Sequence, residues 1–219
     1  MLKKDLSKYA RLMRRGMLFK QLKCVGDNFS YIIADESAGE GVVVDPSFNA
    51  EAIIKYLEKH GLMVRYVINT HSHYDHITDN DKIASKFGAE VIAHTSSTNQ
   101  KDLEVNDNSV IQVGGIKIKI IHTPGHTPDS ICLLVDNKLL TGDTLFVGEC
   151  GRTDLPGGSA RELYHSLFGK LMKLDDRVEV YPGHDYGIRP YSTIGLEKKT
   201  NYVLKERTLE EFIEFMRSP

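Results

Sequence analysis

The sequence predicts an α/β fold in which two β-sheets pack as a sandwich. Short β-branched runs bounded by Gly, Pro or Asp alternate with helical patterns in both halves of the 219-residue chain. So many short, glycine-bounded strands favour two packed sheets over one doubly wound sheet. Because no linker or repeat interrupts this pattern, we expect a single domain over residues 17–219, preceded by an extension at 1–16.

The extension is basic, with six Lys or Arg side chains and one acid. Leu2, Leu6, Tyr9 and Met13 recur at helical spacing, which predicts a short amphipathic helix or a frayed tail. A membrane or partner anchor is the alternative. Residues 1–16 lack the continuous apolar stretch that a signal peptide needs.

The elements of the first half follow from periodicity and from the glycines that end them. Runs rich in β-branched residues predict strands, and apolar residues three or four apart predict helices. Gly61 and Gly88 each follow a helical pattern and can end it. The predicted elements are strands 17–25, 28–35, 41–47, 65–70 and 90–94 and helices 49–60 and 79–87.

The second half opens with strands joined by tight turns of Gly, Pro, Asp or Asn. Helical patterns then surround one further strand and close the chain. The predicted elements are strands 109–113, 115–123, 129–136, 138–143 and 178–183 and helices 159–174, 192–205 and 208–216.

The composition excludes several classes of function. With 28 Lys and Arg against 30 Asp and Glu, the chain lacks the basic excess that nucleic-acid and anionic membrane surfaces need. No run of about 18 apolar residues predicts a membrane span. Cys24, Cys132 and Cys150 are odd in number and form no CxxC pair, which indicates a reducing, cytoplasmic compartment. We therefore expect a small-molecule substrate, with neither nucleic acid nor membrane as a partner.

Potential metal ligands are densest directly after the apolar strand at 65–70. His71 and His73 lie two residues apart, so an extended segment would turn both toward one ion. If the chain then turns, Asp75 and His76 face a neighbouring position. Imidazole with carboxylate suits zinc, iron or manganese better than calcium or magnesium.

Three more candidates, His126, Asp143 and His184, each end an apolar run beside Gly or Pro. Strand ends next to such loops are where α/β folds place reactive groups. His122 precedes the Pro-Gly turn before His126, and we interpret it as structural.

These motifs occur in order as HSHYDH, HTPGHT, TGDTLF and YPGH, and they closely resemble the metal motifs of the metallo-β-lactamase fold superfamily. The similarity runs from about Met17 to Lys205, and within the superfamily the chain looks like the glyoxalase II group of thiolester hydrolases and their short relatives. The resemblance implies a four-layer αββα sandwich with the metals at one edge of the two sheets.

The resemblance also implies roles for single residues. It places one metal on His71, His73 and His126 and the other on the set Asp75, His76 and His184. Asp143 would bridge the two ions, most simply zinc, with iron or a mixed pair as alternatives. A hydroxide shared by the ions would attack the substrate carbonyl, with Asp75 and Asp143 as the catalytic carboxylates.

Departures within the superfamily narrow the function. Antibiotic-degrading members carry a cysteine at the Asp143 position, diiron oxygen reductases carry a glutamate at the His73 position, and nuclease members insert a large domain. These departures leave small-molecule chemistry, and within it the resemblance favours a thiolester hydrolase. One alternative is a mononuclear iron persulfide dioxygenase, in which only His71, His126 and Asp143 would bind the metal. A metal-stabilised binding module without turnover is the other.

Two residues are candidates for holding the substrate. Arg152 could clamp a carboxylate of the thiol carrier through two hydrogen bonds, or could instead pair with Asp154 or Glu149. Tyr186 could donate a hydrogen bond to a developing oxyanion, although packing is the simpler interpretation. No motif in the sequence indicates the acyl group, the carrier thiol or the oligomeric state.

Overall fold

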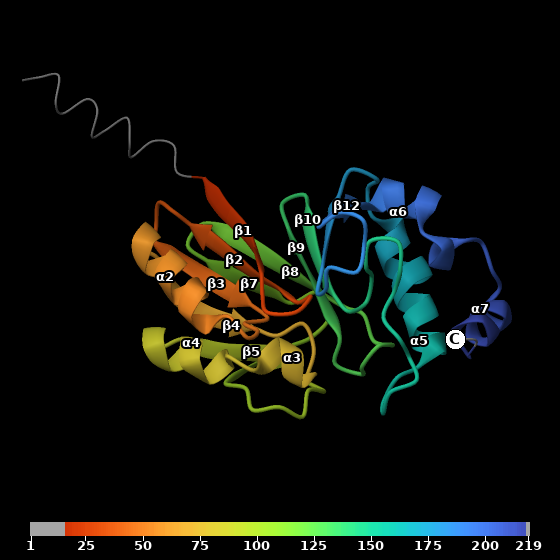
Figure 1. Ribbon diagram of the computed structural model, residues 1–219, viewed down its shortest axis with the longest axis horizontal. Coiled ribbons are helices and arrows are strands. Elements are labelled where there is room, and N and C mark those ends of the chain that lie inside the picture. Colours follow the sequence, from red (N-terminus) through yellow and green to blue (C-terminus); the bar gives the residue numbers. More distant parts are fainter. Residues whose placement is uncertain (1–15, 218–219) are drawn as a thin grey trace, which may run out of the picture.

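A computed structural model of the chain describes residues 16–217, so the helix predicted at 1–16 lies outside the described residues except for Gly16. Two six-stranded sheets dominate the fold (Figure 1). The first runs in the order β1 (Met17–Lys23), β2 (Phe29–Asp35), β3 (Glu40–Val44), β4 (Met63–Ile68), β5 (Glu90–His94) and β6 (Leu103–Val105). The second runs in the order β12 (Ser192–Thr193), β11 (Glu179–Pro182), β10 (Lys138–Gly142), β9 (Ile131–Val135), β8 (Ile116–His122) and β7 (Val110–Val113).

Helices cover the outer face of each sheet. The helices are α2 (Ala50–His60), α3 (Tyr74–Ile77), α4 (Asn80–Phe87), α5 (Ala160–Tyr164), α6 (Ile194–Thr200) and α7 (Leu209–Arg217). Buried side chains of α2 and α4 pack on the first sheet, and those of α5, α6 and α7 pack on the second (Figure 1). A third apolar core, which includes Ile33, Ile118 and Leu133, lies between the sheets. The expected four-layer αββα sandwich is confirmed.

The sheets bring several strand ends to one edge. β10 and β11 are parallel, with Leu140 opposite Tyr181 and Gly142 opposite Pro182, so the residues that follow them emerge side by side. The end of β4, in the first sheet, lies at the same edge. There the Ile131 amide of the second sheet donates a hydrogen bond to the Thr70 carbonyl at 2.8 Å and joins the two sheets. The site is therefore built on strand ends of both sheets.

The structure differs from the predicted elements where segments are short. The strands β6 and β12 have three and two residues, too few to show alternation, and neither was predicted. Two predicted helices are also divided. The one at 159–174 consists of α5, a π-helical turn and a 3₁₀ turn, while the one at 192–205 begins after β12 and ends at Thr200. Across residues 16–217, no helix combines the length and the apolar character needed to span a membrane.

Candidate metal centre

The loop after β4 and the loop after β8 supply a first group of three imidazoles. His73 Nδ1 lies 3.1 Å from His71 Nε2 and 2.9 Å from His126 Nε2. His71 and His126 are buried, whereas His73 is partly exposed. Their facing nitrogens lie within 4.8 Å of one another, close enough to share one ion.

The chain does turn after His73, as Asp75 and His76 require if they are to face a second position. The turn is the short helix α3, which begins after His73. It directs Asp75 and His76 toward His184, which follows β11 in the other sheet. Ligand atoms of these three residues also lie within 4.8 Å of one another, and His76 Nε2 lies 3.2 Å from His184 Nε2. This is the second group of three that the resemblance implies.

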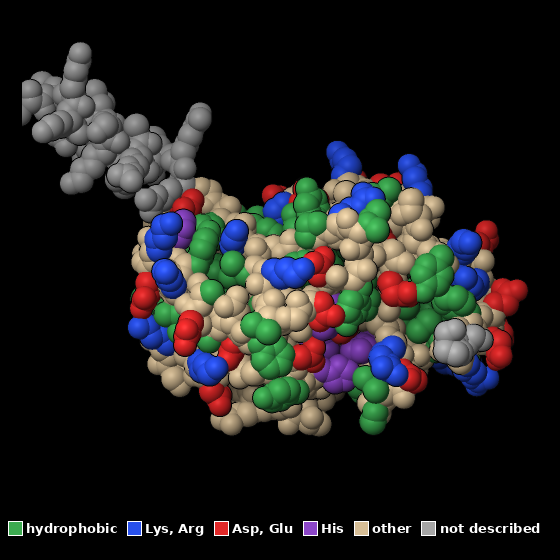
Figure 2. All heavy atoms as spheres, viewed as in Figure 1, with side chains coloured by type: hydrophobic (Ala, Val, Ile, Leu, Met, Phe, Trp, Pro, Cys, Tyr) green, Lys and Arg blue, Asp and Glu red, His purple; other side chains and the backbone are tan. Residues whose placement is uncertain are grey.

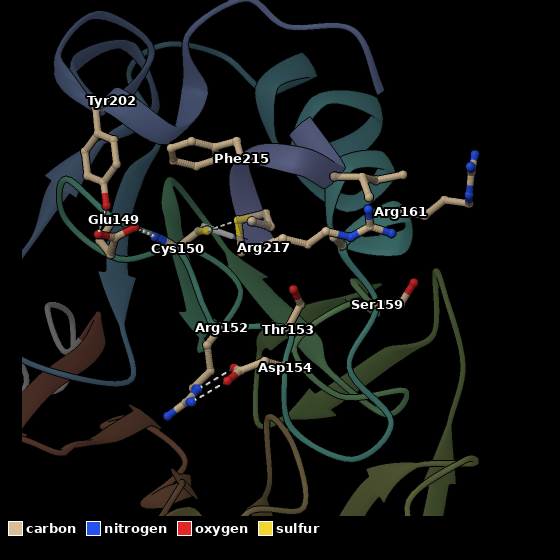
Figure 3. A pocket seen from close by; sticks show the side chains of 13 residues that line it. Glu149, Cys150, Arg152, Thr153, Asp154, Ser159, Arg161, Tyr202, Phe215 and Arg217 are labelled. Carbon is tan, nitrogen blue, oxygen red and sulfur yellow. Dashed lines mark hydrogen bonds and ion pairs between the residues drawn. The ribbon is translucent and has the colours of Figure 1, made fainter. Parts of the chain in front are cut away.

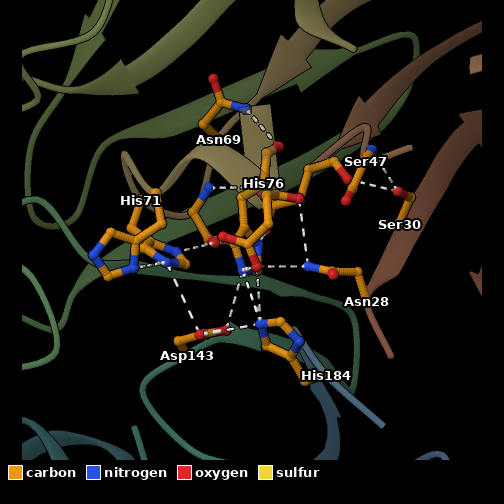
Figure 4. A network of polar contacts seen from close by, with 12 residues as sticks. Asn28, Ser30, Ser47, Asn69, His71, His76, Asp143 and His184 are labelled. Carbon is orange, nitrogen blue, oxygen red and sulfur yellow. Dashed lines mark hydrogen bonds and ion pairs between the residues drawn. The ribbon is translucent and has the colours of Figure 1, made fainter. Parts of the chain in front are cut away.

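Asp143 lies between the two groups (Figure 4). Its Oδ2 is 3.6 Å from His126 Nε2 and 3.3 Å from His184 Nε2, and its Oδ1 is 3.4 Å from His76 Nε2. Close packing of this carboxylate depends on Gly183, where an added Cβ would lie 2.4 Å from Asp143 Oδ1. One carboxylate thus contacts histidines of both groups.

Four of the five imidazoles are held from behind through Nδ1, which leaves Nε2 facing inward. The partners are Thr70 Oγ1 for His71, Asp45 Oδ2 for His76, the Arg152 carbonyl for His126 and Asp27 Oδ1 for His184. A donor bond from Nδ1 fixes the tautomer whose Nε2 carries a free lone pair. The arrangement therefore points the Nε2 atoms of these four imidazoles into the site, where a metal would bind them in their neutral form.

Asp45 links the two groups from below. Its Oδ1 accepts from the Thr70 amide at 2.7 Å and its Oδ2 accepts from the Thr70 hydroxyl at 2.6 Å, in addition to its contact with His76. The residue adopts φ 47°, a left-handed conformation that Asp tolerates better than most side chains. We did not predict Asp45, although its place at the end of the strand predicted at 41–47 matches that of the other site residues.

The electrostatics of the site favour a bound cation. The Nε2 atoms of His76 and His184 face each other at 3.2 Å. Asp143 Oδ1 is buried and accepts no hydrogen bond from the described residues. Burial disfavours a charged His76, but Asp143 and the bond to Asp45 outweigh burial and raise its pKa to about 9. The site thus stabilises positive charge, and its donor set fits divalent zinc or iron.

Two other pKa shifts agree with this interpretation. Burial, and then the neighbouring His76, holds the pKa of His71 well below its usual range, so this ligand is neutral at pH 7. Burial would raise the pKa of Asp143, yet His76, His184 and His71 together hold it well below its usual range. The carboxylate is therefore charged at every pH at which the imidazoles can bind a metal.

The predicted substrate residues lie at the rim. The guanidinium of Arg152 donates two hydrogen bonds to Asp154, at 2.6 and 2.5 Å, which is the alternative that the sequence left open (Figure 3). Its role as a carboxylate clamp remains a prediction. The Tyr186 ring stacks on His184, with ring centroids 4.8 Å apart. Burial, with Asp27 and Asp143, raises the pKa of the phenol to about 12, so it can donate a hydrogen bond at neutral pH.

A cavity of about 790 Å³ begins at Arg152 and reaches α7 (Figure 3). Arg161 and Arg217 line it together with the apolar side chains of Phe215 and Met216. In the space-filling view, several histidine side chains gather in one surface patch with charged side chains around it (Figure 2). His122 belongs to neither group of candidate ligands and stacks on His94, with ring centroids 3.8 Å apart.

Comparison with known proteins agrees with this geometry. The chain matches the Metallo-beta-lactamase superfamily over residues 25–99 and 95–184. It is 36% identical over 170 residues to the hydroxyacylglutathione hydrolase of Pelagibacter ubique, which covers 75% of this chain and 70% of that protein. It is 32% identical over 203 residues to the human mitochondrial persulfide dioxygenase ETHE1, which covers 91% of this chain and 78% of that protein.

A solved structure gives the same result. The crystal structure of ETHE1 from Myxococcus xanthus superimposes with a TM-score of 0.88 at 34% identity, covering 92% of this chain and 91% of that one. The chain therefore belongs to the metallo-β-lactamase superfamily, and it is an enzyme of that superfamily whose His and Asp groups fit a metal site.

We predict that Asp143→Asn lowers the metal content more than any other single change at the site. The substitution keeps the shape but removes the negative charge that holds closely spaced cations together. Elemental analysis of the purified variant measures the effect. Asp185→Asn is the matched control, since Asp185 adjoins His184 but pairs with Lys23. Unchanged metal content in Asp143→Asn would show that this residue does not bridge two ions.

Proposed function

We propose that the chain is a metal-dependent hydrolase that cleaves a small thiolester, or a related ester, at a centre of two divalent ions. The observation that carries the proposal is the position of Asp143, which contacts histidines of two separate groups of three ligands. A shared carboxylate between two such groups is the arrangement that a two-metal hydrolytic site needs. Zinc, iron or a mixed pair fits these donors.

The protein's own residues supply position and charge. Bound divalent ions would lower the pKa of water and polarise the substrate carbonyl. The outward bonds of the histidines hold Nε2 in place throughout, and Asp143 keeps its charge. Asp75 and His73 are the two candidate ligands that are not fully buried, and 37% of the Asp75 side chain is accessible. Its carboxylate is therefore placed to accept a hydrogen bond from an attacking water.

The surroundings suit a thiol carrier with acidic groups. The cavity beside Arg152 combines Arg161 and Arg217 with an apolar wall, and Glu149 and Asp154 also line it. Its two arginines are candidates to bind a carboxylate of the substrate. Tyr186, protonated at neutral pH, is placed to donate to the oxyanion that develops on the substrate. We further propose that residues 17–219 act as one domain. We also propose a reducing, cytoplasmic compartment, because the three cysteines are buried and form no disulfide.

A second candidate function is persulfide dioxygenation at a single iron. It is favoured by the extent of the match to the persulfide dioxygenase ETHE1, which covers 91% of this chain, against 75% for the hydroxyacylglutathione hydrolase. The required iron ligands would be His71, His126 and Asp143, two imidazoles and a carboxylate. Asp143 Oδ2 lies 4.0 Å from His71 Nε2 and 3.6 Å from His126 Nε2, so the geometry can also accept this arrangement.

His76→Ala separates the two functions. We expect it to remove the second ion and nearly all cleavage of a glutathione thiolester, because only the two-ion mechanism uses His76. His71→Ala or His126→Ala should abolish either activity, since both functions share these ligands. Each variant is assayed for thiolester cleavage, measured as thiol release, and for oxygen consumption with glutathione persulfide.

The control is His122→Ala, which leaves all seven candidate ligands in place. Full thiolester hydrolysis by His76→Ala would contradict the two-ion centre. Persulfide oxidation that survives in His76→Ala, with no hydrolysis in the unaltered protein, would favour the dioxygenase.

Arg152→Lys tests the substrate clamp. Lysine keeps the charge but loses the planar two-point contact, so a clamp predicts a strongly raised KM for a carboxylate-bearing thiolester with unchanged metal content. A purely structural pair with Asp154 predicts a lower melting temperature and the same KM. Arg177→Lys is the matched control, because Arg177 makes the same two-bond contact with Asp175 elsewhere on the surface. An unaltered KM in Arg152→Lys removes this residue from the substrate site.

A further inference from the structure

The turn between β1 and β2, residues Gly26 to Asn28, belongs to the first sheet. It packs against His184, the candidate ligand that follows β11 in the second sheet. The Phe29 amide donates to the Gly183 carbonyl at 2.8 Å, and the Asp185 amide donates to the Asp27 carbonyl at 2.7 Å. These two bonds flank His184 on both sides. The left-handed φ of 82° at Gly26 lets the chain reverse here. The turn is thus fixed directly against the segment that carries His184.

Both polar side chains of the turn contact ligands of the second group. Asn28, only 4% exposed, donates from Nδ2 to Asp75 Oδ2 at 3.0 Å (Figure 4). Asp27 Oδ1 lies 3.2 Å from His184 Nδ1 and accepts its hydrogen. The third member, His76, is held by Asp45 and not by the turn. Neither Asp27 nor Asn28 bonds to His71, His73 or His126, so the turn touches one group only.

These contacts act on the two ligands that need support. Asp75 is half-buried and would otherwise be free to turn toward water, and the bond from Asn28 to one oxygen orients the carboxylate. His184 can carry its hydrogen on either nitrogen, and Asp27 selects the form with a free Nε2. Partners of this kind, one step removed from the metal, typically change metal affinity by about 10–100-fold.

We infer that Asp27 and Asn28 are positioning residues that set the metal affinity of the group Asp75, His76 and His184 independently of the other group. They thereby decide whether the centre holds one ion or two under limiting metal. The inference rests on the proposed two-ion centre. It extends that proposal by assigning control of the second ion to a turn outside the four metal motifs.

The test is a titration of the full metal-free chain with Co²⁺, followed by its visible absorption and by calorimetry. His184→Ala identifies which binding step belongs to the second group, because that step is lost in this variant. In Asn28→Ala and Asp27→Ala we expect the same step to weaken about 10–100-fold, with the other step unchanged. Asp27→Asn keeps an acceptor oxygen for His184 and should recover much of the affinity. Lys23→Ala is the matched control, since it breaks the pair with Asp185 in the same junction and contacts no ligand.

The outcomes separate this inference from the function on which it rests. A single binding step in the unaltered chain overturns the two-ion function and the inference with it. Two steps in the unaltered chain that persist unchanged in Asn28→Ala and Asp27→Ala, or that weaken equally, overturn the inference alone. Thermal unfolding of each metal-free variant checks that the fold is retained. If the buried Asn28 does not tolerate substitution, the half-exposed Asp27 and its Asn variant decide the result.

Discussion

The rest of the site depends on one interaction. This is the attraction between the negative charge of Asp143 and positive charge held among the inward-facing imidazole nitrogens. A buried carboxylate and a cluster of lone pairs are costly unless positive charge joins them. His76 supplies part of this positive charge, because Asp143 and the bond to Asp45 raise its pKa to about 9. Most neighbouring features serve to hold this arrangement, including the left-handed backbone at Asp45, which costs about 1–2 kcal/mol.

Much of the fold was predictable because its long elements have strong periodicity and clear ends. The helix α2, for example, presents Ile53 and Leu57 to the sheet and ends at Gly61 in the left-handed conformation, as expected. The strand β12 could not be found, since two residues carry no alternation, and its pairing with β11 is a tertiary effect. The π-helical turn at His165–Lys170 is likewise invisible to a periodicity of 3.6.

The site shows the same division. Residues of the four motifs could be selected because several ligand-type side chains followed apolar strands, and the structure brings all seven together. Asp45, Asp27 and Asn28 were missed because their importance lies in hydrogen bonds across 31, 157 and 47 positions of sequence. Arg152 was selected from the sequence for its charge, but the sequence could not show which partner it contacts. Its two hydrogen bonds to Asp154 depend on the loop conformation.

The two candidate functions share a fold and the ligands His71, His126 and Asp143, and they differ in the number of ions that the centre holds. The central claim is that both groups of three ligands bind a divalent ion, with Asp143 between them. The most direct measurement is elemental analysis of the protein purified without chelators. We predict about two zinc, iron or mixed ions per chain, and a single iron per chain with no other metal would contradict the two-ion centre.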